Sequence, residues 1–407
     1  MIQIGYQTAH RRQDENSGVR SLRSLTQVRL RRNEFAAIED RLKHMNVVFR
    51  ADANHNIGMG HIMRCLSIAD AFQTLGHNVS FIIADEGISS LIKQRGYEAV
   101  ILNSDYRIME EELKLWPELT PDLIIVDSYY VTATYLCSLR EKLITETGES
   151  GKLVYIDDVY SFPYPVDILV DYNAYASLPS YSDLYRDRRE PEPQLILEPT
   201  YAPLRSMFRN IPKKVQKDRV ENILISTGGS DELHLALAIL RAVISSVRSN
   251  HVYHFLIGAM NADKDEIKKV AAEVEWVQLH ENVTDMRSLI EGMDLVISAA
   301  GSTLYEICAC GVPLITFSTA DNQIPGAEAF DRLGLGINAG DLRDPDSIDH
   351  NAVMSGKLRP DAVELILTEA EKLADDYQKR ALMGTRMQEL IDGFGADRMV
   401  QKILSFC

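Results

Sequence analysis

Short apolar segments of four to seven residues recur along the chain, and most are followed by a longer segment with apolar residues at helical spacing. Runs of this length that are rich in Val, Ile and Leu are typical of strands buried on both faces. Alternation of such strands with helices indicates parallel sheets that helices cover on both sides. The pattern predicts strands at 46–52, 79–83, 98–102, 122–127 and 152–158, and then at 222–227, 252–258, 276–279, 294–300 and 313–317.

The alternation is interrupted once, and this interruption indicates a domain boundary. Residues 173–193 are rich in Tyr, Ser and Pro, and residues 209–221 are polar, as expected of a segment between domains. We therefore predict an α/β protein with two Rossmann-like, doubly wound domains that face a cleft, one at 45–212 and one at 213–407 with C-terminal helices. A chain of 407 residues is long enough for two such domains.

The composition narrows the class of protein. Hydrophobic residues make up 45% of the chain and charged residues 25%, and the formal net charge is −16. A charge of this sign argues against nucleic acid as a general partner. The five cysteines show no zinc-binding spacing, and no apolar run reaches the ~20 residues of a membrane span. We expect a cytoplasmic protein, with its oligomeric state left open.

The first 44 residues differ from the rest of the chain. They carry nine Lys or Arg against five Asp or Glu, and they show no apolar periodicity. We expect residues 1–44 to form a poorly ordered extension.

The turn after the first strand is a candidate catalytic site, because ligands of doubly wound sheets bind beyond the carboxyl ends of the strands. Gly58 and Gly60 allow the backbone to approach a ligand closely. His61 lies in the first turn of the predicted helix 61–75, where the helix dipole disfavours imidazolium. A neutral imidazole suits a general base, although a structural hydrogen bond at a helix terminus is the alternative.

Two glycine-containing turns of the second domain are candidate phosphate sites. The first contains Gly228, Gly229 and Ser230, and the second contains Gly301, Ser302 and Thr303. Both turns join a strand to a helix, whose free N–H groups suit an anion. Glu306 either closes a capping box with Thr303 or binds the two hydroxyls of a ribose, and spacing alone does not separate these.

Polar residues after other strands are candidates for sugar contacts. Asn322 and Gln323 open a helix after 313–317, and Tyr129 follows the strand that ends at Asp127. Asp157 and Asp158 are adjacent in a strand, so their side chains are expected on opposite sides of the sheet. The sequence therefore predicts no metal site and no cofactor.

The ordered series of motifs resembles one family. FRADANHNIGMGHIMRC, VDSYY, IDDVY, DYNAYA, STGGSD, ISAAGSTLYE, DNQ and IDGFGADR follow one another from Met45 to near the C-terminus. Together they resemble the UDP-2,4-diacetamido-2,4,6-trideoxy-β-L-altropyranose hydrolases of pseudaminic acid biosynthesis and the related spore-coat polysaccharide biosynthesis proteins. GGSD or AAGST alone would indicate only the wider group of nucleotide-sugar enzymes with a GT-B fold.

The resemblance implies a GT-B-like fold whose second domain holds the nucleotide. It implies His61 as the base, Tyr129 and Asn322 in the sugar site, and Glu306 as the acidic residue after the AAGST turn. The family often has Asp-His-Tyr where this chain has Asp127-Ser128-Tyr129, which leaves the identity of the sugar open.

We therefore predict a metal-independent enzyme in which His61 activates water to attack the anomeric carbon of a UDP-sugar. Arg50, Gly58, Gly60, Tyr129, Asn322 and Gln323 are the predicted sugar-side residues, and the two turns above, with Glu306, are the predicted nucleotide site. A glycosyltransferase that uses a sugar hydroxyl in place of water, and a non-catalytic nucleotide-sugar-binding protein, are the alternatives.

Overall fold

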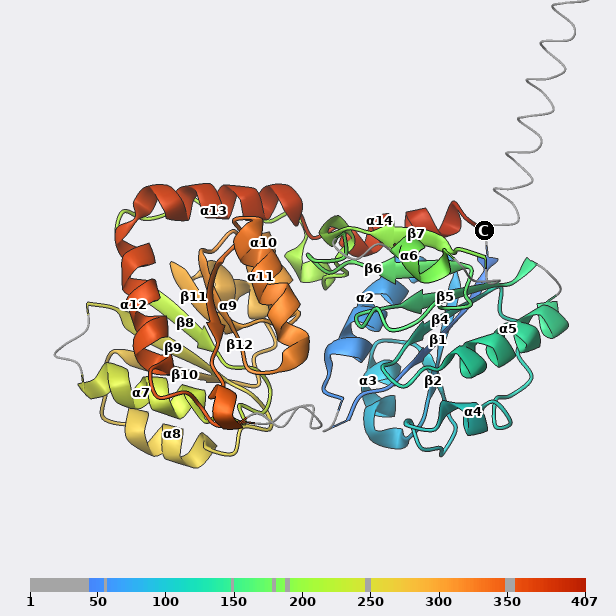
Figure 1. Cartoon of the computed structure of the whole chain (residues 1–407), viewed down its shortest axis with the longest axis horizontal. Helices are drawn as coiled ribbons and strands as arrows, with labels where there is room; N and C mark the ends of the chain where they lie inside the picture. Colours follow the sequence, from blue (N-terminus) through green and yellow to red (C-terminus); the bar gives the residue numbers. More distant parts are fainter. Residues whose placement is uncertain are drawn as a thin grey trace, which may run out of the picture.

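The computed structural model describes residues 44–54, 57–147, 150–177, 181–186, 191–245, 250–347 and 356–407. The expectation of a poorly ordered extension falls almost entirely on residues 1–43, which lie outside the described residues. The rest of the chain forms two α/β domains that lie end to end (Figure 1).

The first domain is built on a seven-stranded parallel sheet with the order β3-β2-β1-β4-β5-β6-β7. The order reverses direction between β1 and β4, so the turns after these two strands lie side by side at the switch point of the sheet. The strands are β1 (Asn46–Ala51), β2 (Asn78–Ile83), β3 (Glu98–Ile101), β4 (Leu123–Asp127), β5 (Lys152–Ile156), β6 (Ile168–Asp171) and β7 (Gln194–Leu197).

The second domain repeats this plan with a six-stranded parallel sheet of the order β10-β9-β8-β11-β12-β13. Its switch point lies between β8 and β11. The strands are β8 (Asn222–Ser226), β9 (Val252–Ile257), β10 (Val277–Glu281), β11 (Leu295–Ala299), β12 (Leu314–Ser318) and β13 (Ile337–Asp341).

Helices cover both faces of each sheet, as buried parallel strands require. In the first domain they are α2 (Gly60–Thr74), α3 (Ser89–Gln94), α4 (Met109–Glu112), α5 (Ala133–Thr147) and α6 (Tyr181–Tyr185). In the second they are α7 (Leu235–Ser245), α8 (Lys264–Ala271), α9 (Met286–Glu291), α10 (Thr303–Cys310), α11 (Ile324–Arg332), α12 (Ala362–Asp375) and α13 (Tyr377–Leu390).

Strand alternation separates the two cores of the first domain. Phe49 packs with Phe72 of α2 on one face of the sheet. Val48, its neighbour in β1, packs with Leu136 and Leu139 of α5 on the other face. The predicted amphipathic helix at 61–75 is therefore present as α2, and its apolar stripe anchors the turn that carries His61.

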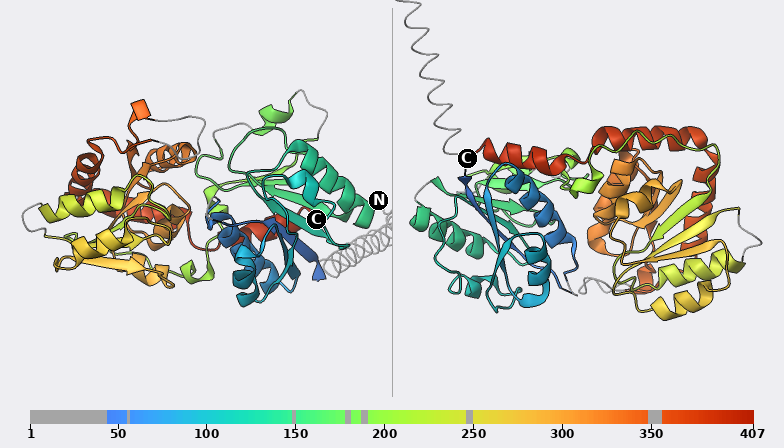
Figure 2. Two further views of the ribbon diagram at one scale, coloured as in Figure 1. Left: turned by 90° about the horizontal axis from the view of Figure 1, so that it is seen from below. Right: turned by 180° about the vertical axis from the view of Figure 1, so that it is seen from behind.

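The last helix, α14 (Gly395–Leu404), corrects the expected assignment of residues 213–407 to the second domain. Figures 1 and 2 show that α14 leaves α13 and lies over the first domain, where it packs on α2. Its Met399, Val400 and Ile403 are buried, so the helix needs an apolar partner surface that α2 provides.

Within the described residues the chain therefore crosses between the domains twice, and the two crossings touch. A Cβ atom at Gly393 would lie 2.1 Å from the carbonyl oxygen of Phe208, and one at Gly395 would lie 2.1 Å from that of Ala202. Only glycine allows two backbones to approach this closely.

Three strands were absent from the sequence prediction. β6 and β7 have four residues each, and β13 reads Ile-Asn-Ala-Gly-Asp, which lacks an apolar run. Such segments become strands because a neighbouring strand pairs with them, and this pairing is not visible in local sequence.

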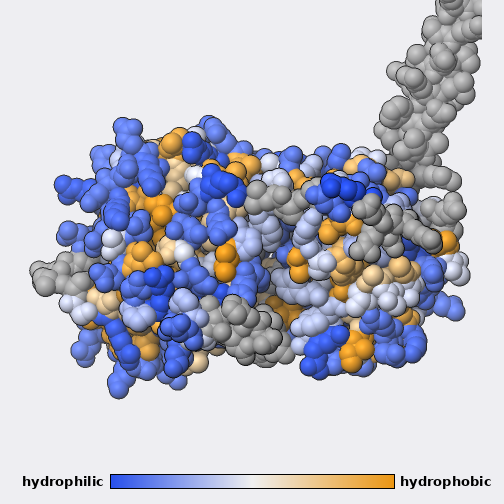
Figure 3. All heavy atoms as spheres, viewed as in Figure 1, coloured by the Kyte–Doolittle hydropathy of each residue, from blue (hydrophilic) through white to orange (hydrophobic). Residues whose placement is uncertain are grey.

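No helix among the described residues is long and apolar enough to cross a membrane. On the face seen in Figure 3, hydrophobic side chains are scattered among hydrophilic ones.

Candidate active site

A cavity of about 290 Å³ lies between the two domains. The first domain contributes residues from the turns after β1, β4, β5 and β6, and the second contributes residues from the turns after β11 and β12. These are the carboxyl ends of parallel strands, where ligands of doubly wound sheets bind.

His61 enters this cavity from the start of α2. After β1 the chain turns through Gly58, whose φ of 77° lies in the left-handed region that favours glycine. Helix α2 then begins at Gly60. His61 is 5% exposed and lines the cavity, so the turn predicted from the two glycines places an imidazole where a ligand would bind.

Asp127 fixes the orientation of this imidazole. Its Oδ1 lies 2.5 Å from Nδ1 of His61. Asp127 is the last residue of β4 and pairs directly with Ala51 of β1, so adjacent strand ends bring the two side chains together. A carboxylate only accepts hydrogen bonds, so in the neutral imidazole Nδ1 donates and Nε2 is the acceptor.

Arg64 clamps the same carboxylate from one helical turn further along α2. Its Nε donates to Oδ2 of Asp127 at 2.6 Å, and its Nη2 donates to Oδ1 at 2.6 Å. Burial alone would raise the pKa of Asp127, but the charge of Arg64 and the hydrogen bonds hold this pKa well below its usual range. Asp127 is therefore an ionised acceptor for His61 at any physiological pH.

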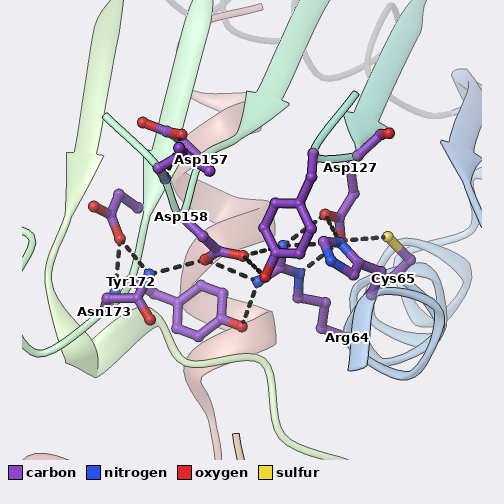
Figure 4. Close-up of polar contacts among 12 residues, drawn as sticks. Arg64, Cys65, Asp127, Asp157, Asp158, Tyr172 and Asn173 are labelled. Carbon is purple, nitrogen blue, oxygen red and sulfur yellow. Dashed lines mark hydrogen bonds and ion pairs between the residues drawn. The ribbon is translucent and has the colours of Figure 1, made fainter. Parts of the chain in front are cut away.

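Asp158 completes the polar side of the first domain (Figure 4). Nη1 of Arg64 donates to Oδ1 of Asp158 at 3.0 Å and to the hydroxyl of Tyr172 at 3.0 Å. The hydroxyl of Tyr129 lies 3.5 Å from Oδ2 of Asp158, and its ring meets the ring of His61 edge to face at 4.4 Å. Tyr129 therefore lies beside both the imidazole and the carboxylate, on the wall of the cavity.

Asp157 points away from Asp158, as strand alternation predicts. Its carboxylate accepts hydrogen bonds from the hydroxyls of Tyr164 at 2.8 Å and Tyr181 at 2.7 Å. Within the described residues no group of three or more His, Cys, Asp or Glu side chains is arranged to hold a metal ion.

The second domain closes the cavity with backbone and amide groups. Gly301 and Ser302 precede α10, and Asn322 and Gln323 precede α11, as predicted from the sequence. The hydroxyl of Tyr305 accepts a hydrogen bond from the backbone N–H of Ala174 at 3.0 Å, which joins the two domains at the cavity. The residues of the second domain that line the cavity include Gly301, Ser302, Tyr305, Asn322, Gln323 and Phe330.

Glu306 does not close a capping box. The N-cap of α10 is Ser302 without a side-chain cap, and Oε1 of Glu306 instead accepts from Nη2 of Arg205 at 2.8 Å. Burial raises the pKa of Glu306, and the charge of Arg205 opposes this shift. Thr303 and Glu306 lie outside the lining of the cavity, so a ribose contact at Glu306 requires the nucleotide to extend along α10.

Arg50 is a correction to the sequence prediction. It is completely buried and shares the α5 side of the sheet with Val48. Its Nε and Nη2 donate to Glu112 at 2.7 and 2.6 Å, and its Nη1 donates to Asp52 at 2.5 Å. A guanidinium that is buried in the interior and paired with two carboxylates cannot orient a sugar in the cavity.

The other predicted turn lies apart from this cavity. Gly228, Gly229 and Ser230 follow β8, and none of them lines the cavity. The turn packs on the next strand end, because the N–H of Met260 donates to the carbonyl of Gly229 at 3.1 Å. Their predicted phosphate role also requires a ligand larger than this cavity. Gly58, in the turn after β1, does not line the cavity either.

Sequence reasoning missed several cavity residues. Arg64 stands three positions after His61 on one helix face, and this spacing was a usable signal. Asn173 and Tyr175 follow β6, a strand that was not predicted, so nothing placed them at a strand end. The first-domain lining includes His61, Arg64, Tyr129, Asp158, Tyr172 and Asn173.

Known proteins resemble this chain in sequence. The family model described as the glycosyltransferase family 28 C-terminal domain matches residues 222–344. The UDP-2,4-diacetamido-2,4,6-trideoxy-beta-L-altropyranose hydrolase of Campylobacter jejuni is 30% identical over 63% of this chain and 85% of its own length. The spore coat polysaccharide biosynthesis protein SpsG of Bacillus subtilis is 23% identical over 87% of this chain and 96% of its own. An uncharacterized protein of Methanocaldococcus jannaschii is 25% identical, and there the chain spans 55% of the relative's length.

The fold also matches a solved structure. MurG of Acinetobacter baumannii superposes with a TM-score of 0.56 at 14% identity, over 88% of this chain and 99% of MurG. The prediction of two Rossmann-like domains facing a cleft, in a GT-B-like arrangement, is thereby confirmed.

Proposed function

We propose, since this chain belongs to the family of the UDP-2,4-diacetamido-2,4,6-trideoxy-β-L-altropyranose hydrolases, that it hydrolyses a UDP-linked 2,4-diacetamido-trideoxy sugar to UDP and the free sugar. The single observation that carries this proposal is the His61–Asp127 pair on the wall of the interdomain cavity, which makes Nε2 the acceptor of the neutral imidazole. An imidazole held in this way is suited to take a proton from water.

The proposed reaction has one substitution at the anomeric carbon. A water oxygen forms a bond to this carbon as the bond to the phosphate oxygen of UDP breaks. UDP leaves with the electron pair, and the water proton passes to Nε2 of His61. Asp127 stabilises the imidazolium that forms, as an ionised carboxylate does for a catalytic histidine.

The leaving group requires stabilisation of its negative charge. The turn at Gly301 and Ser302 leads into the N-terminus of α10, and the first backbone N–H groups of this helix favour an anion. No step of this proposal uses a metal ion. Arg64 is fully occupied by Asp127, Asp158 and Tyr172, so we assign it to the support of His61 rather than to phosphate.

In this proposal the sugar lies between the two domains, and the nucleotide is held by the second domain. Tyr129 on the first domain and Asn322 and Gln323 on the second would contact the sugar. Glu306 would bind ribose while Arg205 holds its other side. A cavity of about 290 Å³ is small for a whole nucleotide sugar, so the UDP moiety extends beyond it.

A glycosyltransferase is the second candidate. It is favoured by the match of residues 222–344 to a glycosyltransferase domain and by the likeness to MurG. A sugar hydroxyl would then replace water, with the same base and leaving group.

Incubation with UDP-linked 2,4-diacetamido sugars and no acceptor separates these candidates. A hydrolase releases UDP and free sugar, and His61→Ala does not. UDP release that depends on an added acceptor would establish a transferase. Tight binding without any turnover would establish a binding protein.

A further inference from the structure

Asn173 occupies a position in the cavity that the proposed mechanism does not use. It follows β6 by two residues and lines the cavity on the side of the first domain, together with His61, Tyr129 and Asp158. Its side chain lies beside the carboxylates of Asp158 and Asp171 (Figure 4).

The two carboxylates determine which way the amide of Asn173 faces. Its Nδ2 lies 2.8 Å from Oδ1 of Asp158 and 2.9 Å from Oδ1 of Asp171. These oxygens accept hydrogen bonds, so both hydrogens of the amide are used. In the flipped orientation the amide oxygen would face two acceptors. The oxygen Oδ1 of Asn173 is therefore the part of the amide that stays available to a ligand.

The backbone holds Asn173 in this place from both domains. Its own N–H donates to Oδ1 of Asp171 at 2.9 Å, and the N–H of Ala174 donates to the hydroxyl of Tyr305 at 3.0 Å. The side chain is thus a preorganised acceptor on the sugar side of the cavity, where a bound ligand displaces water from it.

We propose that Oδ1 of Asn173 accepts a hydrogen bond from a donor on the sugar ring, and that Asn173 thereby determines which sugars are accepted. An acetamido N–H donates but does not accept, so it is the complement of an oxygen that only accepts. A ring hydroxyl at the same position is the other source of a donor, and the experiment separates the two. The inference rests on the proposed function only in taking the ligand to be a UDP-sugar.

The competing explanation is purely structural. Asn173 joins Asp158 to Asp171, and this bridge alone would justify an amide at the position. A structural role predicts lower stability or disturbed binding of every ligand when Asn173 is replaced. A specificity role predicts that only sugars with the donor are affected, because an acceptor left without its donor weakens binding of that sugar alone.

The test measures binding in the His61→Ala background, so that no turnover occurs and its outcome is independent of the reaction catalysed. The probes are UDP and the UDP-linked 2,4-diacetamido sugar, with analogues in which either acetamido group is replaced by hydroxyl or by hydrogen. Calorimetry gives the Kd of each probe for His61→Ala and for its combinations with Asn173→Ala and with Asn78→Ala. Asn78 is an exposed asparagine of the same domain and serves as the matched control.

We expect Asn173→Ala to weaken the diacetamido sugar by ~10- to 100-fold. It should leave UDP and one hydrogen-substituted analogue unchanged, and that analogue identifies the ring position. If the hydroxyl analogue is weakened as much as the acetamido sugar, the donor is any O–H or N–H. If the hydroxyl analogue binds with the same Kd whether or not Asn173→Ala is present, the donor that Asn173 recognises is the acetamido N–H.

Two results would overturn the inference. One is that Asn173→Ala leaves the ratio of the Kd of the acetamido sugar to the Kd of every analogue unchanged. The other is that Asn173→Ala weakens the binding of UDP itself as much as that of the acetamido sugar. If Asn173→Ala does not fold, Asn173→Ser decides, because a hydroxyl can still donate to one of the two carboxylates while the amide oxygen is removed. The donor-bearing sugar must then be weakened while UDP is not, and an unchanged preference among the sugars would count against the inference.

Discussion

Asp127 ties His61 to the switch point of the first sheet, with Oδ1 of the carboxylate 2.5 Å from Nδ1 of the imidazole. The contact joins the end of β4 to the start of α2. It gives the neutral histidine one tautomer and one orientation.

Asp127→Asn should lower kcat by ~10²–10⁴, and His61→Ala should do the same. An asparagine amide can donate to Nδ1 of His61, which places the remaining ring proton on Nε2 and removes the base. UDP affinity should be nearly unchanged in both variants, because neither residue lies on the nucleotide side. Steady-state kinetics and UDP titrations check this, and more than half of normal turnover in either variant would contradict the role of the pair.

Mutations should separate the binding of the nucleotide from the binding of the sugar. Glu306→Ala should weaken UDP by roughly 10- to 150-fold, because it removes a charged partner of ribose. Tyr129→Phe should leave UDP affinity unchanged and impair only the intact UDP-sugar. Calorimetric titration of both ligands measures this.

Arg205→Met is the matched control for Glu306, because it breaks the same ion pair from the other side. If the pair is only structural, Arg205→Met and Glu306→Ala should lower the melting temperature alike, and neither should change UDP affinity. That outcome would remove Glu306 from the nucleotide site.

The buried carboxyl group of Asp171 should make the free energy of unfolding depend on pH. The hydroxyl of Tyr181 lies 2.7 Å from Oδ2 of Asp157 and 2.9 Å from Oδ2 of Asp171, and it has one hydrogen to donate. A protonated Asp171 supplies the second hydrogen. Burial raises the pKa of Asp171 from 3.8 to about 7. The hydrogen bond from the backbone N–H of Asn173 opposes this rise, and the negative charge of Asp158 adds to it.

Because this folded-state pKa lies above the unfolded value, the protonated carboxyl stabilises the fold fully below about pH 4, and this contribution is lost as the pH rises through about 7. Asp171→Asn keeps the acceptor for Asn173 and gives Tyr181 a permanent donor. It should raise the free energy of unfolding at pH 8 by roughly 2–4 kcal/mol and flatten the profile between pH 4 and 7. Chemical denaturation across this range measures it, with the exposed Asp183→Asn as control; an unchanged profile would show that Asp171 is ionised throughout.

Activity should survive an excess of EDTA. Arg64 already places a positive charge between Asp127 and Asp158, where a cation would otherwise be attracted. Turnover with and without chelator is the measurement. Loss of activity that Mg²⁺ or Mn²⁺ restores would move Asp158 to the centre of a metal-dependent mechanism.

The sequence predicted the fold well where local pattern determines structure. The run Asp-Leu-Ile-Ile-Val-Asp became β4 because an apolar run of this length must be buried, and the two glycines before His61 marked a strand-to-helix turn. The same logic failed for β6, whose four residues form a strand only because β5 and β7 pair with them.

The site was predicted less completely, since its contacts join distant segments. Arg50 was assigned to the sugar although its alternation with Phe49 placed it on the opposite side of the sheet from α2, and its partner Glu112 is 62 positions away. Asn173 could be connected to Asp158 only by knowing that β5 and β6 are neighbours. The position of His61 at the cavity could be predicted because the glycines that mark its strand-to-helix turn are its neighbours in the sequence.

The contact between the two interdomain crossings has a mechanical consequence. Because the backbone at Gly393 and Gly395 touches the backbone at Phe208 and Ala202, the two crossings lie side by side. Adjacent connecting segments of this kind are where a hinge between two domains forms. Rotation about such a hinge would change the distance between His61 and Asn322 across the cavity. A side chain introduced at Gly393 or Gly395 would act as a wedge in this hinge, altering the closed angle without touching a single cavity residue.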